Sequence, residues 1–207
     1  FCPESELSGI GYKDFIPAVW YKRSITVTEE QMKGRVLLHF GAVDYECDVY
    51  INGEKAGSHF GGYSSFTLDI TDFLNIGEND LTVNARDNVR SGKQPKGKQS
   101  SAFYSQVCDY TRTTGIWQTV WLEPVHTSHI SSLRIVPDVD RNNLKLTVDV
   151  ANGDGLLIEA RLMDEGKEVA LAKGYTGFDM TICVANPKLW SPESPFLYDM
   201  EISLYKK

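Results

Sequence analysis

Apolar and polar residues alternate along most of this chain with a period of two, the pattern of strands that bury one face. Val36, Leu38 and Phe40 share one face of the segment 35–43, and the segment 46–51 repeats the alternation. Sustained helical periodicity is nearly absent. The pattern predicts an all-β protein built from many short strands.

Turn residues separate the predicted strands. Asn52-Gly53 can adopt the positive φ angles of a tight hairpin turn, so 54–60 is predicted to return beside 46–51. Residues 71–74 are expected to form a single helical turn. The other strands of the first half are predicted at 18–28, 65–71, 80–87 and 116–123.

The alternation pauses at a short linker near 124–128 and then resumes. The strands before the linker favour two packed layers, either a jelly roll or a Greek-key sandwich. The shorter second part suits an immunoglobulin-like sandwich that lacks the paired cysteines of antibody domains. We therefore expect two domains, 1–125 and 126–207. Strands of the second are predicted at 131–137, 144–150, 156–163, 168–174, 178–184 and 197–204.

One long segment without alternation interrupts the first domain. Residues 88–101, NVRSGKQPKGKQSS, hold four basic residues and no acidic one. Loops of this length inside a compact domain are usually functional or mobile. Both a binding loop and a solvated excursion are compatible with the sequence.

Composition and charge exclude some partners. The 207 residues carry 21 Lys and Arg against 28 Asp and Glu, and the net charge of -7 gives no attraction to nucleic acid or to anionic membranes. No apolar run approaches the roughly 20 residues that cross a bilayer. Because the chain begins at Phe1, without a Met or a leader, we expect a processed or cut start.

No metal or cofactor site is predicted. The four cysteines are far apart and form no CxxC pair, so free thiols are expected at Cys2, Cys47, Cys108 and Cys183. His126 and His129 are three residues apart, a spacing that places them on opposite sides of an extended chain. They are interpreted as linker residues.

Catalytic motifs are equally absent. Hydrolysis of a glycosidic bond needs two facing carboxyl groups. Asp44, Glu46 and Asp48 share one strand face, which we interpret as a solvated sheet face. Nucleophile-elbow and phosphate-loop motifs do not occur. Trp117 and Trp121 could stack on sugars, but their alternating positions favour the core.

The stretch QVCDYTRTTGIWQTVWLEP at 106–124 carries a specific resemblance. It is similar to the end of the sugar-binding domain of glycoside hydrolase family 2, which includes β-galactosidases, β-glucuronidases and β-mannosidases. VWYKRSITV at 19–27 and the segment 35–71 agree with that family in order, and LWSPESPFLYDMEISL at 189–204 resembles the end of its immunoglobulin-like domain.

The resemblance implies a jelly-roll, galactose-binding-like domain and an immunoglobulin-like domain of a retaining glycosidase, whose catalytic glutamates belong to a TIM barrel. That barrel would begin where this chain stops, at Lys207, so we expect the fragment to be inactive. In the family, the aspartate six residues before the Gly of a (S/T/A)-G-I motif reaches the sugar. Asp109 holds that position here, and Arg112 is a second substrate-binding candidate that could orient the loop or lie in solvent.

Three functions remain open at this point. The first is a non-catalytic portion of a glycosidase, whose partners are the barrel of the same polypeptide, its β-glycoside substrate and, in the full-length enzyme, further copies. The second is a free-standing carbohydrate-binding module with a spacer domain. The third is an adhesin-like pair of sandwiches that acts through protein contacts.

Overall fold

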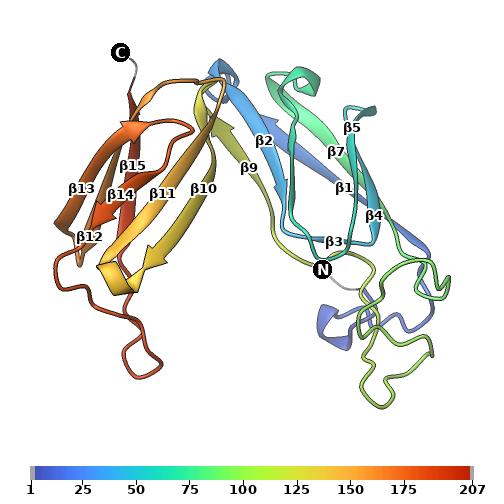
Figure 1. Cartoon of the computed structure of the whole chain (residues 1–207). Coiled ribbons are helices and arrows are strands. Elements are labelled where there is room, and N and C mark those ends of the chain that lie inside the picture. Colours follow the sequence, from blue (N-terminus) through green and yellow to red (C-terminus); the bar gives the residue numbers. More distant parts are fainter. Residues whose placement is uncertain (1–2, 206–207) are drawn as a thin grey trace. The chain divides into compact units, whose positions relative to one another are not determined.

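A computed structural model describes residues 3–205 and divides the chain into two compact units, with the division between Val125 and His126 (Figure 1). Both units are built almost entirely from antiparallel strands, which confirms the all-β prediction. The helical elements of the described residues are single 3₁₀ turns: η1 (Glu6–Ser8), η2 (Gln31–Lys33), η3 (Thr71–Phe73) and η4 (Val139–Arg141). None of them is long enough to cross a membrane.

The first unit is a sandwich of two main sheets. One has the strand order β1 (Ala18–Val27), β7 (Gly77–Arg86), β4 (Glu46–Ile51) and β5 (Glu54–Phe60). The other has the order β6 (Phe66–Asp69), β2 (Arg35–Phe40) and β9 (Val120–Val125). A third, two-stranded sheet pairs β3 (Val43–Asp44) with β8 (Gly115–Ile116). In sequence, β3 lies between β2 and β4, and β8 lies between β7 and β9.

The core of this unit follows from the alternation. Leu38 and Phe40 of β2 are fully buried together with Val49 of β4 and Val83 of β7, so the inner faces of both sheets meet. The β4–β5 hairpin also has the predicted turn, with φ of 53° at Asn52 and 84° at the following glycine. The predicted alternation of buried residues and the predicted hairpin are both confirmed.

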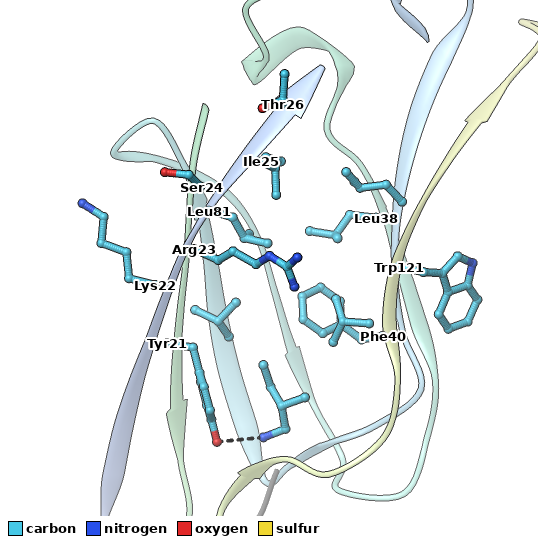
Figure 2. A pocket seen from close by; sticks show the side chains of 14 residues that line it. Tyr21, Lys22, Arg23, Ser24, Ile25, Thr26, Leu38, Phe40, Leu81 and Trp121 are labelled. Carbon is cyan, nitrogen blue, oxygen red and sulfur yellow. Dashed lines mark hydrogen bonds between the residues drawn. The ribbon is translucent and has the colours of Figure 1, made fainter. Parts of the chain in front are cut away.

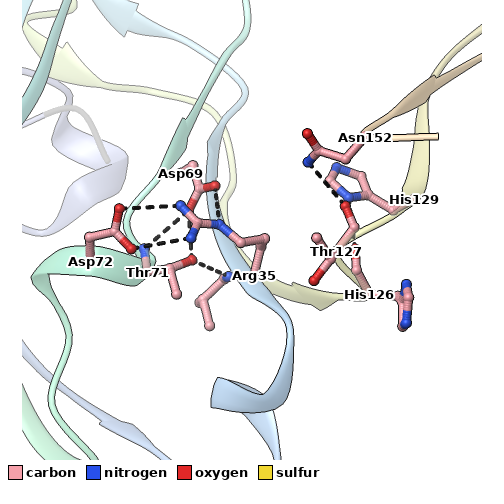
Figure 3. A network of polar contacts seen from close by, with 9 residues as sticks. Arg35, Asp69, Thr71, Asp72, His126, Thr127, His129 and Asn152 are labelled. Carbon is pink, nitrogen blue, oxygen red and sulfur yellow. Dashed lines mark hydrogen bonds and ion pairs between the residues drawn. The ribbon is translucent and has the colours of Figure 1, made fainter. Parts of the chain in front are cut away.

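The predicted helical turn is present as η3, and a polar network anchors it (Figure 3). Arg35 Nε donates to Asp69 Oδ2 at 2.7 Å, and its Nη1 lies 3.2 Å from Asp72 Oδ1. The hydroxyl of Thr71 donates to Asp69 and accepts from the backbone N–H of Val36 at 2.8 Å. That last bond is buried, so it ties the turn to the start of β2.

Replacing Thr71 by Val should lower the free energy of unfolding of the first unit by about 1–3 kcal/mol, because the buried N–H of Val36 loses its acceptor. Urea unfolding measures the change. Thr67→Val is the matched control, since the Thr67 hydroxyl hydrogen-bonds a side chain, the His39 ring at 2.9 Å, and no buried backbone N–H depends on it. Equal losses in the two variants would contradict the assignment.

The second unit is an immunoglobulin-like sandwich of two three-stranded sheets. Their orders are β10 (His129–Asp138), β11 (Asn143–Ala151), β14 (Met180–Cys183) and β13 (Lys167–Tyr175), β12 (Leu157–Asp164), β15 (Asp199–Tyr205). Leu146 and Val148 of β11 pack with Ile158 and Ala160 of β12 in its core. The six strands match the segments predicted for this half.

The interpretation of Trp121 as a core residue is wrong. β8 ends at Ile116 and β9 begins at Val120, so the alternation does not continue from Trp117 to Trp121. Val120 and Leu122 take the inner face of β9, and Trp121 therefore points outward, 45% exposed and stacked on a histidine ring. Trp117 is half-buried and donates its indole N–H to a backbone carbonyl.

Candidate functional site

The candidate site lies in the long loop between β7 and β8, residues 87–114, which folds back on itself. Ser100 N donates to Tyr110 O at 2.8 Å, and Tyr110 N donates to Lys98 O at 2.7 Å. The basic segment 88–101 is therefore packed beside the later half of the loop, and Ser100 is fully buried. The segment is more than a solvated excursion.

Asp109 is presented by a tight turn and held by a lysine of the basic segment. Its N–H donates to Gln106 O at 2.8 Å and its C=O accepts from Gln106 N at 3.1 Å. Lys96 Nζ lies 3.0 Å from Asp109 Oδ2 and also donates to Gln99 O at 2.7 Å. The Asp109 side chain is 26% exposed, so its carboxylate is oriented and still accessible to a hydroxyl group.

Arg112 has a different environment, because its side chain is 2% exposed. Its guanidinium donates to the carbonyl oxygens of Ala102 and Lys13, and it lies 4.1 Å from the centre of the Phe15 ring. Arg112 therefore joins the loop to the segment before β1. Of the alternatives left open by the sequence, this geometry favours orientation of the loop over a sugar contact or a place in solvent.

A buried glutamine connects the two halves of the loop to the sandwich. Gln99 Nε2 donates to Asp44 Oδ2 at 2.9 Å and lies 3.3 Å from Asp87 Oδ2, while its Oε1 accepts from Thr113 N at 2.8 Å. Sequence reasoning missed this cluster. Its members are far apart in the chain and match no motif, so only the folded structure brings them together.

Burial dominates the electrostatics of this cluster. It raises the pKa of Asp44 to about 7, with smaller contributions from the negative charges of Asp87 and Glu4. Burial likewise raises the pKa of Asp87, although Gln99 opposes the shift, and it raises the pKa of Tyr63. The Asp44 and Asp87 carboxyls are 2% and 3% exposed, so neither can face a glycosidic bond.

The predicted solvated face of Asp44, Glu46 and Asp48 is a further correction. β3 ends at Asp44 and pairs with β8, whereas β4 begins at Glu46 and pairs with β7. Asp44 consequently points into the protein, and a side chain at Gly62 would come within 2.2 Å of its carboxylate. Only Glu46 and Asp48 keep the expected face, where both pair with Arg86.

No cluster of metal-binding side chains occurs among residues 3–205. His129 Nδ1 contacts the carbonyl of His126 at 2.9 Å, and Asn152 binds the neighbouring Thr127 carbonyl (Figure 3). The contact between His129 and His126 therefore lies within the linker itself. Cys2 lies outside the described residues, and the free cysteines within them are Cys47, Cys108 and Cys183.

Comparison with known proteins gives the family. The family described as "Glycosyl hydrolase 2 galactose-binding domain-like" matches residues 5–118, and "Glycosyl hydrolases family 2" matches 128–207. The chain belongs to glycosyl hydrolase family 2. The jelly-roll, galactose-binding-like assignment of the first unit is thereby confirmed.

Relatives within glycosyl hydrolase family 2 are considerably longer. A protein of Formosa agariphila with the provisional name β-glucuronidase is 34% identical over 91% of this chain, which spans 23% of that relative. A β-galactosidase of Thermoanaerobacter pseudethanolicus is 27% identical over 93% of this chain, which spans 26% of it. The fold of a Ruminococcus gnavus β-glucuronidase matches with a TM-score of 0.75, at 22% identity, over 94% of this chain and 34% of that one.

Proposed function

We propose that this chain is the non-catalytic N-terminal portion of a retaining β-glycosidase, a β-galactosidase or a β-glucuronidase. Its two sandwiches support a catalytic barrel elsewhere in the polypeptide, and Asp109 completes the substrate pocket. Family membership and the names of the relatives support the enzyme class. The buried position of Asp44 and Asp87 supports the proposal that this portion is not catalytic.

The observation that carries the proposal is the presentation of the Asp109 carboxylate. Lys96 holds one oxygen at 3.0 Å, which orients the carboxylate directly after a tight turn. An ionised carboxylate accepts two hydrogen bonds from adjacent sugar hydroxyls. The ion pair thus prepares a hydroxyl-binding group at low cost in side-chain entropy.

The test compares this chain with the longer protein encoded by its gene. We expect aryl β-galactoside or aryl β-glucuronide hydrolysis by the longer protein and none by residues 1–207. A longer protein that cleaves neither glycoside would refute the proposal. Calorimetric binding of sugars by residues 1–207 alone would instead favour a free-standing carbohydrate-binding module.

In the longer protein, Asp109→Ala is expected to lower kcat/KM about 10- to 100-fold, the loss of one or two hydrogen bonds to a charged group. Thermal stability should stay near wild type, because the Lys96 ion pair is partly exposed. Asp80→Ala is the matched control, since it removes another partly exposed ion pair, with Lys22 at 3.1 Å. Equal kcat/KM values for the two variants would exclude the role of Asp109.

A further inference from the structure

The loop that carries Asp109 is fixed to the sandwich at its two ends. β7 ends directly before it, and at the other end the N–H of Ile116 donates to the Tyr21 hydroxyl at 3.2 Å (Figure 2). That hydroxyl also donates to Thr114 O at 3.4 Å. Of the apolar side chains in this loop, all of which the structure describes, Val89 alone is buried. The position of the middle of the loop therefore depends on polar contacts.

Gln99 is the residue that joins the middle of the loop to Asp109. Its carbonyl oxygen accepts from Lys96 Nζ at 2.7 Å, and the same Nζ lies 3.0 Å from Asp109 Oδ2. The residues on either side of Gln99 pair through their backbones with Tyr110, the neighbour of Asp109. The place of Gln99 consequently sets both the cation that holds the Asp109 carboxylate and the backbone beside it.

The side chain of Gln99 is in turn held by a carboxyl group that favours the neutral form. Asp44 Oδ2 accepts from Gln99 Nε2 at 2.9 Å, whereas Oδ1 lies against the backbone of Gly62 and has no hydrogen-bond partner within residues 3–205. The titratable groups around Asp44 are Asp87 after β7, Glu4 of the N-terminal segment and Tyr63 between β5 and β6.

Ionisation of Asp44 is costly in this setting. A buried carboxylate oxygen without a donor loses its hydration and gains nothing in return, and the charges of Asp87 and Glu4 repel it. Burial accordingly raises the pKa of Asp44 to about 7. Removal of Gln99 would admit water to the carboxyl, so an ionised Asp44 favours states in which the loop has opened.

We propose that Gln99 is the positioning residue for Asp109, and that the neutral carboxyl of Asp44 holds Gln99 in place. When the loop opens, the Lys96 ammonium moves with it and Asp109 loses the contact that orients its carboxylate. The inference rests on the proposed function, in which Asp109 binds the substrate.

Hydrogen–deuterium exchange of residues 1–207 tests the anchor without turnover. The amides of Ser100 and Tyr110 pair within the loop and report its opening. An exposed Asp44 loses its proton near pH 4, so the protection factors of these amides should fall about 100-fold between pH 5 and pH 8, mostly below pH 7. Asp44→Asn should show a fall of less than about 10-fold, and Asp48→Asn should behave as wild type. A flat profile in the wild type, or the same fall in Asp44→Asn, would overturn the proposal.

In the longer protein, Gln99→Met is expected to lower kcat/KM about 10-fold, because a misplaced binding group lowers the rate. Combined with Asp109→Ala, it should cause no loss beyond that of Asp109→Ala alone, since Gln99 acts through Asp109. Gln94→Met is the matched control. Gln94 belongs to the same loop and donates to Asp87 Oδ1 at 2.6 Å, and its loss should leave kcat/KM near wild type. Additive losses for Gln99 and Asp109, or an equal loss in Gln94→Met, would overturn the positioning role.

The two experiments separate this inference from the proposed function. Loop protection that depends on Asp44 in a protein whose kcat/KM is unchanged by Asp109→Ala would refute the role of Asp109 and leave the anchor in place. A large loss in Asp109→Ala that simply adds to the loss in Gln99→Met would keep the proposed function and refute the positioning role of Gln99.

Discussion

Replacing Arg112 by Met is expected to lower the free energy of unfolding of the first unit by about 3 kcal/mol. The methionine fills a similar volume but donates nothing, so the carbonyl oxygens of Lys13 and Ala102 lose a charged donor. The stacking on Phe15 at 4.1 Å is lost as well. Both effects loosen the loop from the segment before β1.

Urea unfolding followed by tryptophan fluorescence measures this loss, since three of the four tryptophans lie before residue 126. Arg141→Met is the matched control, because Arg141 is 78% exposed and pairs with Asp138 only at the surface. We expect less than about 1 kcal/mol there. A change of that size in Arg112→Met would show that the buried guanidinium does not hold the loop.

The strand pattern was predictable where alternation and turn chemistry agree. The β4–β5 hairpin follows from Asn52-Gly53 and from alternating residues on both sides, because both signals are local. Alternation failed where a strand is interrupted. Asp44 lies just before a break between two short strands and Trp121 just after one, and each break changes which face the residues beyond it occupy.

The candidate site was predictable only in part. Asp109 was selected through a motif that is contiguous in sequence, and its role at the sugar stays a prediction; the structure adds that it follows a tight turn. The 28-residue loop folds back on itself, and no local sequence propensity predicts how it does so. The pairing of Asp109 with Lys96 and the hydrogen bond from Gln99 to Asp44 both depend on that folding. The burial of Arg112 could not be predicted either, since a polar loop sequence gives no indication that its guanidinium is buried.

Replacing Asp44 by Asn is expected to raise the free energy of unfolding at pH 8 by about 3 kcal/mol. Burial raises the pKa of Asp44 from 3.8 to about 7, so the folded protein retains a proton that the unfolded chain loses near pH 4. Stability from this group is complete below about pH 4, falls as pH rises toward 7 and is lost above it. One pKa unit corresponds to about 1.4 kcal/mol, which sets an upper limit of about 4 kcal/mol for the gain.

The dependence of this gain on pH distinguishes it from a simple packing effect. Urea unfolding of the variant and the wild type should agree at pH 4 and diverge steadily up to about pH 7.5. Gln99 can still donate to the asparagine oxygen, so the connection to the loop is kept. Because Asp87 stays in the variant, its own raised pKa cancels in the comparison apart from its interaction with Asp44.

Asp48→Asn supplies the control of opposite sign. The hydrogen bond from Lys55 holds the pKa of Asp48 below its ordinary value, so its ionised form stabilises the fold at neutral pH. This variant should be less stable than wild type at pH 7, by less than about 1 kcal/mol, and the difference should vanish as the pH falls. If Asp44→Asn showed a difference that did not vary between pH 4 and 8, the Asp44 carboxyl would be ionised throughout and burial would not control its protonation.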